Sequence, residues 1–145
     1  MSNNTPDYND NLAFQPPKTA GTIETINADN KPVAIRCYVD DKHYFDLALY
    51  DAPETMDWYN AKAWCEENYC RLPMKHELKF IVDNLKLINI MLKLAGAKPL
   101  KREYYWSSSE YSSYSAWVAY LGSSFLNYNY LKNYTRIYVL PVLAL

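Results

Sequence analysis

The chain has 145 residues, a length that suits one domain and can bury a sizeable core without disulfides or metals to hold it. Its formal net charge is -1 and no block of Lys and Arg occurs, which argues against nucleic acid or an anionic membrane as the main partner. There is no apolar run of about 18 residues and no apolar signal-peptide region. We therefore expect a protein that is cytoplasmic at synthesis and does not insert into a membrane.

The first 20 residues are rich in Asn, Asp and Pro and contain few apolar side chains, which predicts a flexible N-terminal arm. Leu12 and Phe14 are its candidate anchors, either to the domain or to a neighbouring subunit of a homo-oligomer. Residues 21–145 form the domain itself.

Strands are expected first, because β-branched and aromatic residues alternate with polar ones after the arm. A short strand is predicted at residues 21–26, and clearer strands at 32–39 and 43–50. The polar residues 40–42 lie between the last two segments and predict a β-hairpin turn.

Two to three helices are expected in the middle of the chain. The first begins near Thr55, whose hydroxyl can cap a helix, and stops by Asn68. Residues 83–84 separate the second helix from a third at 86–95, for which Gly96 is a natural C-cap. The apolar residues with helical spacing are Met56, Tyr59, Ala63 and Trp64, then Leu78, Ile81 and Val82, and last Ile88, Met91, Leu92 and Ala95.

The last part of the chain returns to strands, with candidates at residues 105–108, 115–121 and 137–142. Helices in the middle and strands at both ends predict an α+β fold in which the two ends of the chain meet in one sheet.

Three cysteines, Cys37, Cys65 and Cys70, are an odd number at scattered positions, so they predict no disulfide framework. Cys65 and Cys70 have no partner pair of Cys or His nearby to complete a metal site. Buried free thiols are the favoured interpretation.

Residues 103–138 have a composition unlike the rest of the chain. Nine of the 15 Tyr lie here, with Ser and Asn between them. Tyr provides large, rigid contacts and Ser and Asn provide adaptable hydrogen bonds, a mixture typical of binding surfaces. A Tyr-rich sheet is the alternative, because Tyr also favours strands. From residue 123 to 135 the Tyr persist although strand alternation fails, which favours a binding surface.

The sequence contains no motif that indicates an enzyme. His43 and His76 each lie near acidic residues, and we interpret both as surface or structural side chains. Neither a nucleophile elbow, a phosphate-binding loop nor an EF-hand pattern occurs. Four acidic residues are the candidates for a carboxylate pair for glycoside hydrolysis, but nothing places two of them together: Glu54, Glu66, Glu67 and Glu110. No catalytic residue, cofactor or metal is predicted.

Five short motifs occur in an order that points to a family. They are Asp-Trp-Tyr-Asn-Ala at 57–61, Arg-Leu-Pro at 71–73 followed by Glu-Leu at 77–78, Tyr-Trp-Ser-Ser-Ser-Glu at 105–110, Ala-Trp at 116–117, and Pro-Val-Leu-Ala-Leu at 141–145. Together, over residues 51–145, they resemble the variable proteins of diversity-generating retroelements. Those proteins have a C-type lectin fold related to the formylglycine-generating-enzyme group.

The resemblance implies a C-type lectin-like domain whose exposed face is built from residues 103–138. In this family, error-prone reverse transcription at template adenines rewrites such a segment, and an AAC codon for Asn becomes Tyr, Ser, Phe, Leu, Thr, Ile or Arg. Lys132 does not arise from AAC in this way, so we expect it to be fixed. The residues compatible with rewriting are Tyr111, Tyr114, Tyr120, Phe125, Leu126, Tyr128, Tyr130, Tyr134 and Arg136.

These expectations describe a non-enzymatic, receptor-recognition protein that binds a macromolecular target such as a protein or glycan on a cell surface. Attachment to a phage tail, and hence a place in a phage virion, is the expected setting. The predicted ligand-binding residues are Tyr111, Ser113, Tyr114, Tyr120, Ser123, Phe125, Leu126, Tyr128, Tyr130, Asn133, Tyr134, Arg136 and Tyr138.

The chain departs from two relatives of that family. It lacks the Glu-Pro-Asn, Gln-Pro-Asp and Trp-Asn-Asp calcium motifs of sugar-binding C-type lectins, and its last cysteine, Cys70, precedes the region where formylglycine-generating enzymes carry theirs. The alternatives are an oxidative enzyme of that class, a single-stranded nucleic-acid binder with Tyr as stacking platforms, a fixed-specificity interaction module, and a structural subunit whose Tyr are buried in an oligomer.

Overall fold

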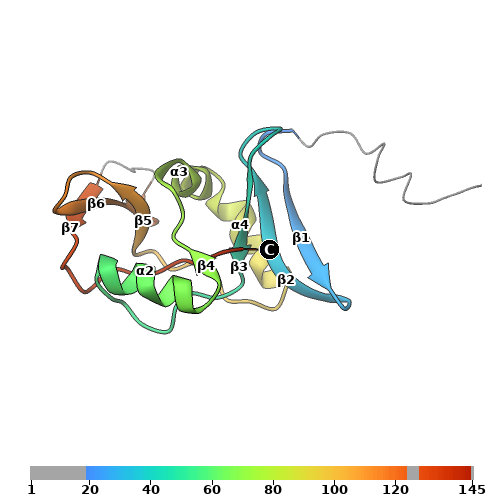
Figure 1. Cartoon of the computed structure of the whole chain (residues 1–145). Helices are drawn as coiled ribbons and strands as arrows, with labels where there is room; N and C mark the ends of the chain where they lie inside the picture. The colour runs from blue at the N-terminus through green and yellow to red at the C-terminus, as the bar shows by residue number, and fades with distance from the viewer. Residues whose placement is uncertain (1–18, 124–127, 145) are drawn as a thin grey trace, which may run out of the picture.

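The computed structural model describes residues 19–123 and 128–144, which form two antiparallel sheets and three helices (Figure 1). This confirms the predicted α+β class, with the helices in the middle of the chain. The strands are β1 (Ile23–Ala28), β2 (Lys31–Tyr38), β3 (Tyr44–Ala48), β4 (Cys70–Arg71), β5 (Tyr104–Glu110), β6 (Ser115–Tyr120), β7 (Tyr128–Leu131) and β8 (Val142–Leu143). The helices are α2 (Trp58–Glu67), α3 (Lys75–Asp83) and α4 (Leu85–Leu94).

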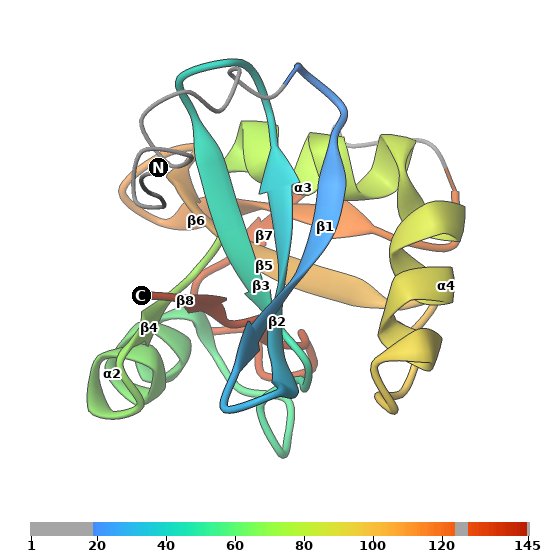
Figure 2. The same ribbon diagram turned by 90° about the vertical axis from the view of Figure 1, so that its right-hand side faces the viewer.

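The larger sheet has the strand order β1-β2-β3-β8-β4, and the smaller one has the order β5-β6-β7. β8, near the C-terminus, pairs with β3 on one side and β4 on the other (Figure 2). The two ends of the described chain therefore share one sheet, as predicted. The smaller sheet lies at the end of the molecule farthest from β1 (Figure 1).

Short polar turns join the first three strands. Between β1 and β2, Asp29 and Asn30 have φ angles of 52° and 63°, a left-handed conformation that Asp and Asn tolerate better than most residues. Between β2 and β3, the carboxylate of Asp40 accepts hydrogen bonds of 2.8 Å from the backbone N–H groups of Lys42 and His43. This turn confirms the predicted β-hairpin.

The first helix begins later than predicted. Asp57, not Thr55, is the N-cap of α2, because its carboxylate accepts a 2.8 Å hydrogen bond from the backbone N–H of Asn60. Met56 is still extended at this point, since its N–H donates to the carbonyl of Ile137 at 3.1 Å. That long-range bridge delays the start of the helix.

The other two helices follow the prediction closely. Asn84 ends α3 and precedes α4, and its side-chain amide donates to the carbonyl of Phe80 at 2.8 Å. At the end of α4, Gly96 has a φ of 80°. The N–H of Ala97 returns to the carbonyl of Leu92 at 2.8 Å, and the N–H of Gly96 to Lys93 at 3.0 Å. These are the two bonds of a Schellman C-cap, which confirms the assigned role of Gly96.

The predicted strand at residues 137–142 is wrong in its extent. Ile137 and Tyr138 make isolated bridges to Met56 and Tyr105, and regular pairing resumes only at Val142 in β8. The segment crosses from the smaller sheet to the larger one, so its neighbours change along its length. β7, in turn, was not predicted, because strand alternation fails in its surroundings.

Two hydrophobic clusters form the core. The first lies where the larger sheet meets α3 and α4, and the second lies where α2 meets the smaller sheet. Fully or almost fully buried members include Ile35, Leu47, Leu78 and Ile88 in the first cluster, and Trp58, Trp106, Val118 and Ile137 in the second. Among the described residues, no helix is long and apolar enough to cross a membrane.

Cys37, Cys65 and Cys70 are buried free thiols, as predicted. Burial raises the pKa of all three thiols above the ordinary value, that of Cys37 to about 12.

Candidate binding face

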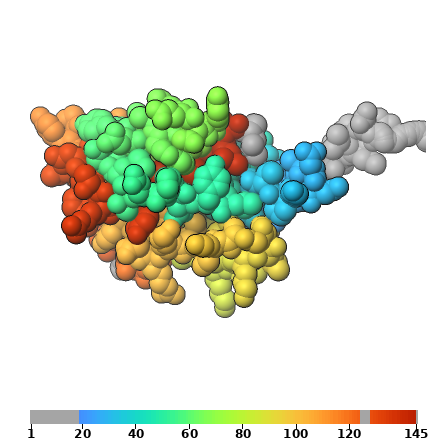
Figure 3. All heavy atoms as spheres, turned by 90° about the horizontal axis from the view of Figure 1, so that it is seen from below, coloured from blue at the N-terminus to red at the C-terminus, as the bar shows by residue number. Residues whose placement is uncertain are grey.

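The smaller sheet presents its tyrosines in two different environments. Along β5, Tyr104 and Tyr105 point to opposite faces because side chains alternate in a strand. Tyr105 is fully buried, and its hydroxyl donates a 2.8 Å hydrogen bond to the carboxylate of Asp51. Tyr104 is half-buried on the other face. The chain that follows β5 forms the surface at this end of the molecule (Figure 3).

Five rings on the Tyr104 side form a cluster. The centroid of Tyr104 lies 4.8 Å from that of Tyr120, 5.7 Å from Tyr128 and 5.2 Å from Tyr130. Tyr134 stacks on Tyr130 at 5.2 Å with an interplanar angle of 24°. We call Tyr104, Tyr120, Tyr128, Tyr130 and Tyr134 the tyrosine cluster. Its members come from β5, β6, β7 and the turn after β7, so it exists only when the sheet forms.

Gly122 makes room for one member of the cluster. A Cβ atom at this position would collide with the ring of Tyr120, whose tip lies over the Gly122 backbone. The absence of a side chain at residue 122 therefore allows the ring of Tyr120 to lie against the backbone there.

A second group of side chains surrounds the tip of the β5–β6 hairpin. Tyr114 is 76% exposed, and Tyr59, from α2, is 56% exposed. With Leu131, Lys132 and Asn133 these two rings line a shallow hollow of about 140 Å³, which we call the tip hollow.

Tyr111 begins a third group at the same hairpin. Its ring meets Trp117 edge to face, with centroids 5.0 Å apart and an angle of 90°. The ammonium group of Lys75, from α3, lies 3.4 Å from the centroid of the Trp117 ring, a cation–π contact. These contacts join the first turn of α3 to the hairpin.

Lys132 is a buried residue at the tip hollow. Its side chain is only 4% exposed, and its ammonium group binds the Glu110 carboxylate, the Ser113 carbonyl at 3.1 Å and the ring of Trp58 at 4.5 Å. The hydrogen bond from Lys132 lowers the pKa of Glu110 below its ordinary value. Lys132 thus belongs to the scaffold.

Most of the predicted ligand-binding residues are accessible, but they do not form one patch. Ser113, Asn133 and Arg136 are exposed and Ser123 is half-buried. Tyr138 lies apart from the tyrosine cluster, because its ring packs on Tyr105 at 5.8 Å, on the opposite side of β5. Phe125 and Leu126 lie outside the described residues.

Two tyrosines of these groups, Tyr59 and Tyr104, were not predicted from the sequence as binding residues. Tyr59 was assigned to a helical core face, but it is exposed beside the tip hollow. Tyr104 was not among the predicted ligand-binding residues. Its adjacency to Tyr105 gave no such signal, because β5 is buried on both faces and the neighbours Tyr105 and Trp106 are both in the core.

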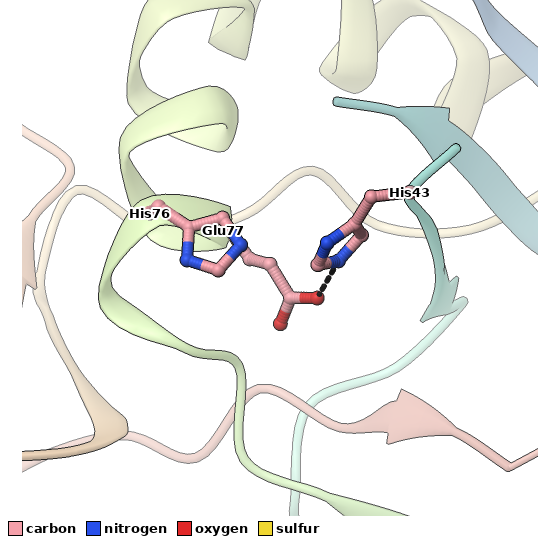
Figure 4. Close-up of side chains that lie close together, drawn as sticks. All are labelled: His43, His76 and Glu77. Carbon is pink, nitrogen blue, oxygen red and sulfur yellow. Dashed lines mark hydrogen bonds and ion pairs between the residues drawn. The ribbon is translucent and has the colours of Figure 1, made fainter. Parts of the chain in front are cut away.

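The two histidines, interpreted separately from the sequence, lie close together beside Glu77 (Figure 4). His43 follows the turn that leads into β3, and His76 is in the first turn of α3. Their ring centroids are 5.0 Å apart, and Nε2 of His43 is 2.9 Å from Oε2 of Glu77. This agrees with the interpretation of both as surface or structural side chains, and adds that folding brings them together with a buried carboxylate.

Comparisons of this chain with protein-family models, with curated proteins and with solved structures found no match.

Proposed function

We propose that this protein is a non-enzymatic binding protein with a C-type lectin-like fold, of the type diversified by retroelements. In this proposal the tyrosine cluster and the tip hollow bind a macromolecular target, such as a protein or glycan on a cell surface. Large aromatic side chains with small polar neighbours suit such contacts, since Tyr and Trp contribute much of the energy at binding hot spots.

One observation carries the proposal. The seven described residues that the resemblance marks as open to rewriting are exposed or half-buried: Tyr111, Tyr114, Tyr120, Tyr128, Tyr130, Tyr134 and Arg136. Five other residues of compatible types in the segment are buried, and we assign them to the scaffold: Tyr105, Ser107, Ser115, Leu121 and Ile137. Lys132, which does not arise from an AAC codon in this way, is buried against Trp58 and Glu110. Burial therefore separates the residues proposed to vary from those that support the fold.

Buried hydrogen bonds of two tryptophans help to hold the scaffold together. Trp106 donates its indole N–H to the carbonyl of Met56 at 2.9 Å, and Trp58 donates to the carbonyl of Ser107 at 2.9 Å. These buried bonds hold α2 against the smaller sheet without using an exposed tyrosine. Loops and strand faces positioned by such a scaffold can change in sequence while the fold remains.

Population sequencing tests the diversification. The 3′ end of the gene and its downstream flank are sequenced across many isolates. We expect substitutions concentrated at the exposed tyrosine codons, at adenines of a nearby imperfect repeat, with Lys132 and Trp106 codons constant. An invariant segment without a repeat would overturn diversification and favour a fixed-specificity module.

A stability experiment tests whether the exposed tyrosines can be replaced without loss of the fold. Three single variants, Tyr114→Ser, Tyr128→Ser and Tyr134→Ser, each remove one exposed ring. We expect each change to alter the free energy of unfolding by about 0.5 kcal/mol or less. The matched change Tyr105→Ser removes a buried ring and should cost about 3 kcal/mol or more. Urea unfolding followed by Trp fluorescence measures both. Equal losses for exposed and buried positions would contradict the proposal.

A further inference from the structure

The Glu77 carboxylate is buried, and three of its acceptor positions are held by fixed donors. Arg71 donates to Oε1 at 2.7 Å and to Oε2 at 2.9 Å, and the backbone N–H of Met74 donates to Oε1 at 2.8 Å. A carboxylate offers about four lone-pair positions. The fourth, on Oε2, faces Nε2 of His43. Glu77 itself is 0% exposed, so this orientation is fixed by its surroundings.

Two imidazoles share the space in front of that remaining position. His43 is 30% exposed and His76 is exposed, so solvent reaches the group from the side of the histidines. One ligand atom from each of His43, His76 and Glu77 lies within 4.8 Å of the other two. In Figure 4 the Glu77 carboxylate extends between the two rings, with His76 from α3 on the left and His43 from the chain entering β3 on the right.

We propose that His43, His76 and Glu77 form a binding site for a divalent transition-metal ion, with Zn²⁺ the best match. Two imidazole nitrogens and one carboxylate oxygen, with a fourth position left to water, are a donor set that zinc uses in proteins. Ligand atoms about 2.0–2.1 Å from a tetrahedral zinc are about 3.4 Å apart, so the side chains need only small rotations to close on the ion. Two nitrogen ligands favour zinc or copper over magnesium or calcium.

The proton shared by His43 and Glu77 must leave Nε2 when the ion binds there. In a neutral ring it moves to Nδ1, and in a doubly protonated ring it is released to solvent; either way a neutral imidazole remains as the ligand. Arg71 acts from behind the carboxylate. Its two hydrogen bonds hold Glu77 in place, as outer-shell partners of a metal ligand do, while its positive charge weakens the attraction between Glu77 and the ion. This site uses no residue of the tyrosine cluster, so the inference does not depend on the proposed function.

The ion would join two parts of the chain that are 33 positions apart, the turn before β3 and the first turn of α3. Because the unfolded chain does not hold these ligands together, zinc should bind the folded state more tightly and raise its melting temperature.

The test uses the full chain without an affinity tag, stripped of metal with a chelator. Isothermal titration with ZnCl₂ should show one ion per chain, and Co²⁺ should give the visible absorption bands of a tetrahedral site. His76→Ala and His43→Ala should each weaken zinc binding roughly 100-fold or more, because loss of an outer-shell partner alone costs 10–100-fold. Lys42→Ala, in the same turn, is the matched control and should bind zinc like the unchanged protein.

The zinc titrations of the unchanged protein and of the two histidine variants decide whether this site exists. Stoichiometric binding that either histidine variant abolishes supports the site. Absence of stoichiometric binding at sub-millimolar zinc, or binding that survives both histidine changes, overturns it. The two histidines are not fully buried, so their removal leaves the core intact, and a circular dichroism spectrum of each variant verifies folding.

Discussion

The ammonium group of Lys132 binds the carboxylate of Glu110, 22 positions earlier in the chain, beside the tip hollow. Glu110 ends β5 and Lys132 follows β7, so the ion pair joins the two outer strands of the smaller sheet at the hairpin tip. The same ammonium group lies over Trp58, which packs α2 against the sheet. The buried side chain of Lys132 therefore connects β5, β7 and α2.

Replacing this lysine should destabilise the fold. We expect Lys132→Met to lower the free energy of unfolding by about 2 kcal/mol, the usual contribution of hydrogen bonds to a charged group. Lys62 is the matched control, because its ammonium group also lies over Trp58, at 4.6 Å, but is exposed. Lys62→Met should change the stability by about 0.5 kcal/mol or less. Urea denaturation measures both, and similar losses would contradict the assigned role of Lys132.

The same ion pair predicts a pH dependence. Because its hydrogen bond from Lys132 lowers the pKa of Glu110 in the folded protein, the stabilisation is complete above the unfolded value of about 4.3. It is lost as the pH falls through the lower, folded pKa. NMR titration of the side-chain carboxyl carbon should show the low pKa in the unchanged protein and an ordinary pKa in Lys132→Met. An ordinary value in both proteins would refute the prediction.

The start of α2 offers a direct comparison of two candidate caps. Asp57→Ala removes the carboxylate that accepts the Asn60 N–H and should cost about 1 kcal/mol. Thr55→Ala lies before the helix and should cost about 0.5 kcal/mol or less. Thermal unfolding monitored by circular dichroism at 222 nm ranks the two variants. A larger loss for Thr55→Ala would restore the cap expected from the sequence.

The three thiols should be unreactive in the folded protein. Cys37, Cys65 and Cys70 are buried, and burial raises the pKa of each thiol, which suppresses the reactive thiolate near neutral pH. We expect slow labelling by a disulfide reagent under native conditions and rapid labelling of all three after unfolding in urea. Mass spectrometry identifies the labelled positions. Rapid labelling of Cys37, which is 0% exposed, would contradict the described packing.

Local sequence patterns correctly predicted the elements whose hydrogen bonds join residues only a few positions apart. The turn around Asp40, the break at Asn84 and the cap at Gly96 depend on bonds within a few residues, so their signals are present in the chain itself. The concentration of Tyr, Ser and Asn in residues 103–138 likewise indicated a surface segment, and most of its described tyrosines are accessible.

Long-range pairing accounts for the elements that the sequence did not predict. Because Met56 is bridged to Ile137, α2 begins after Asp57 and not near Thr55 as predicted. Because the partners change along residues 137–142, the last strand is only β8. No local pattern encodes a partner some 80 positions away.

By itself, the sequence determined the α+β class, the buried thiols and the location of the tyrosine-rich segment, because composition and periodicity act over short distances. The tertiary structure alone decided which tyrosines meet, that Tyr138 lies apart from them, and that Lys132 is buried against Trp58 and Glu110. It also decided that His43, His76 and Glu77 converge. Each of these relationships joins different strands, helices or turns, and therefore exists only when the elements pack together.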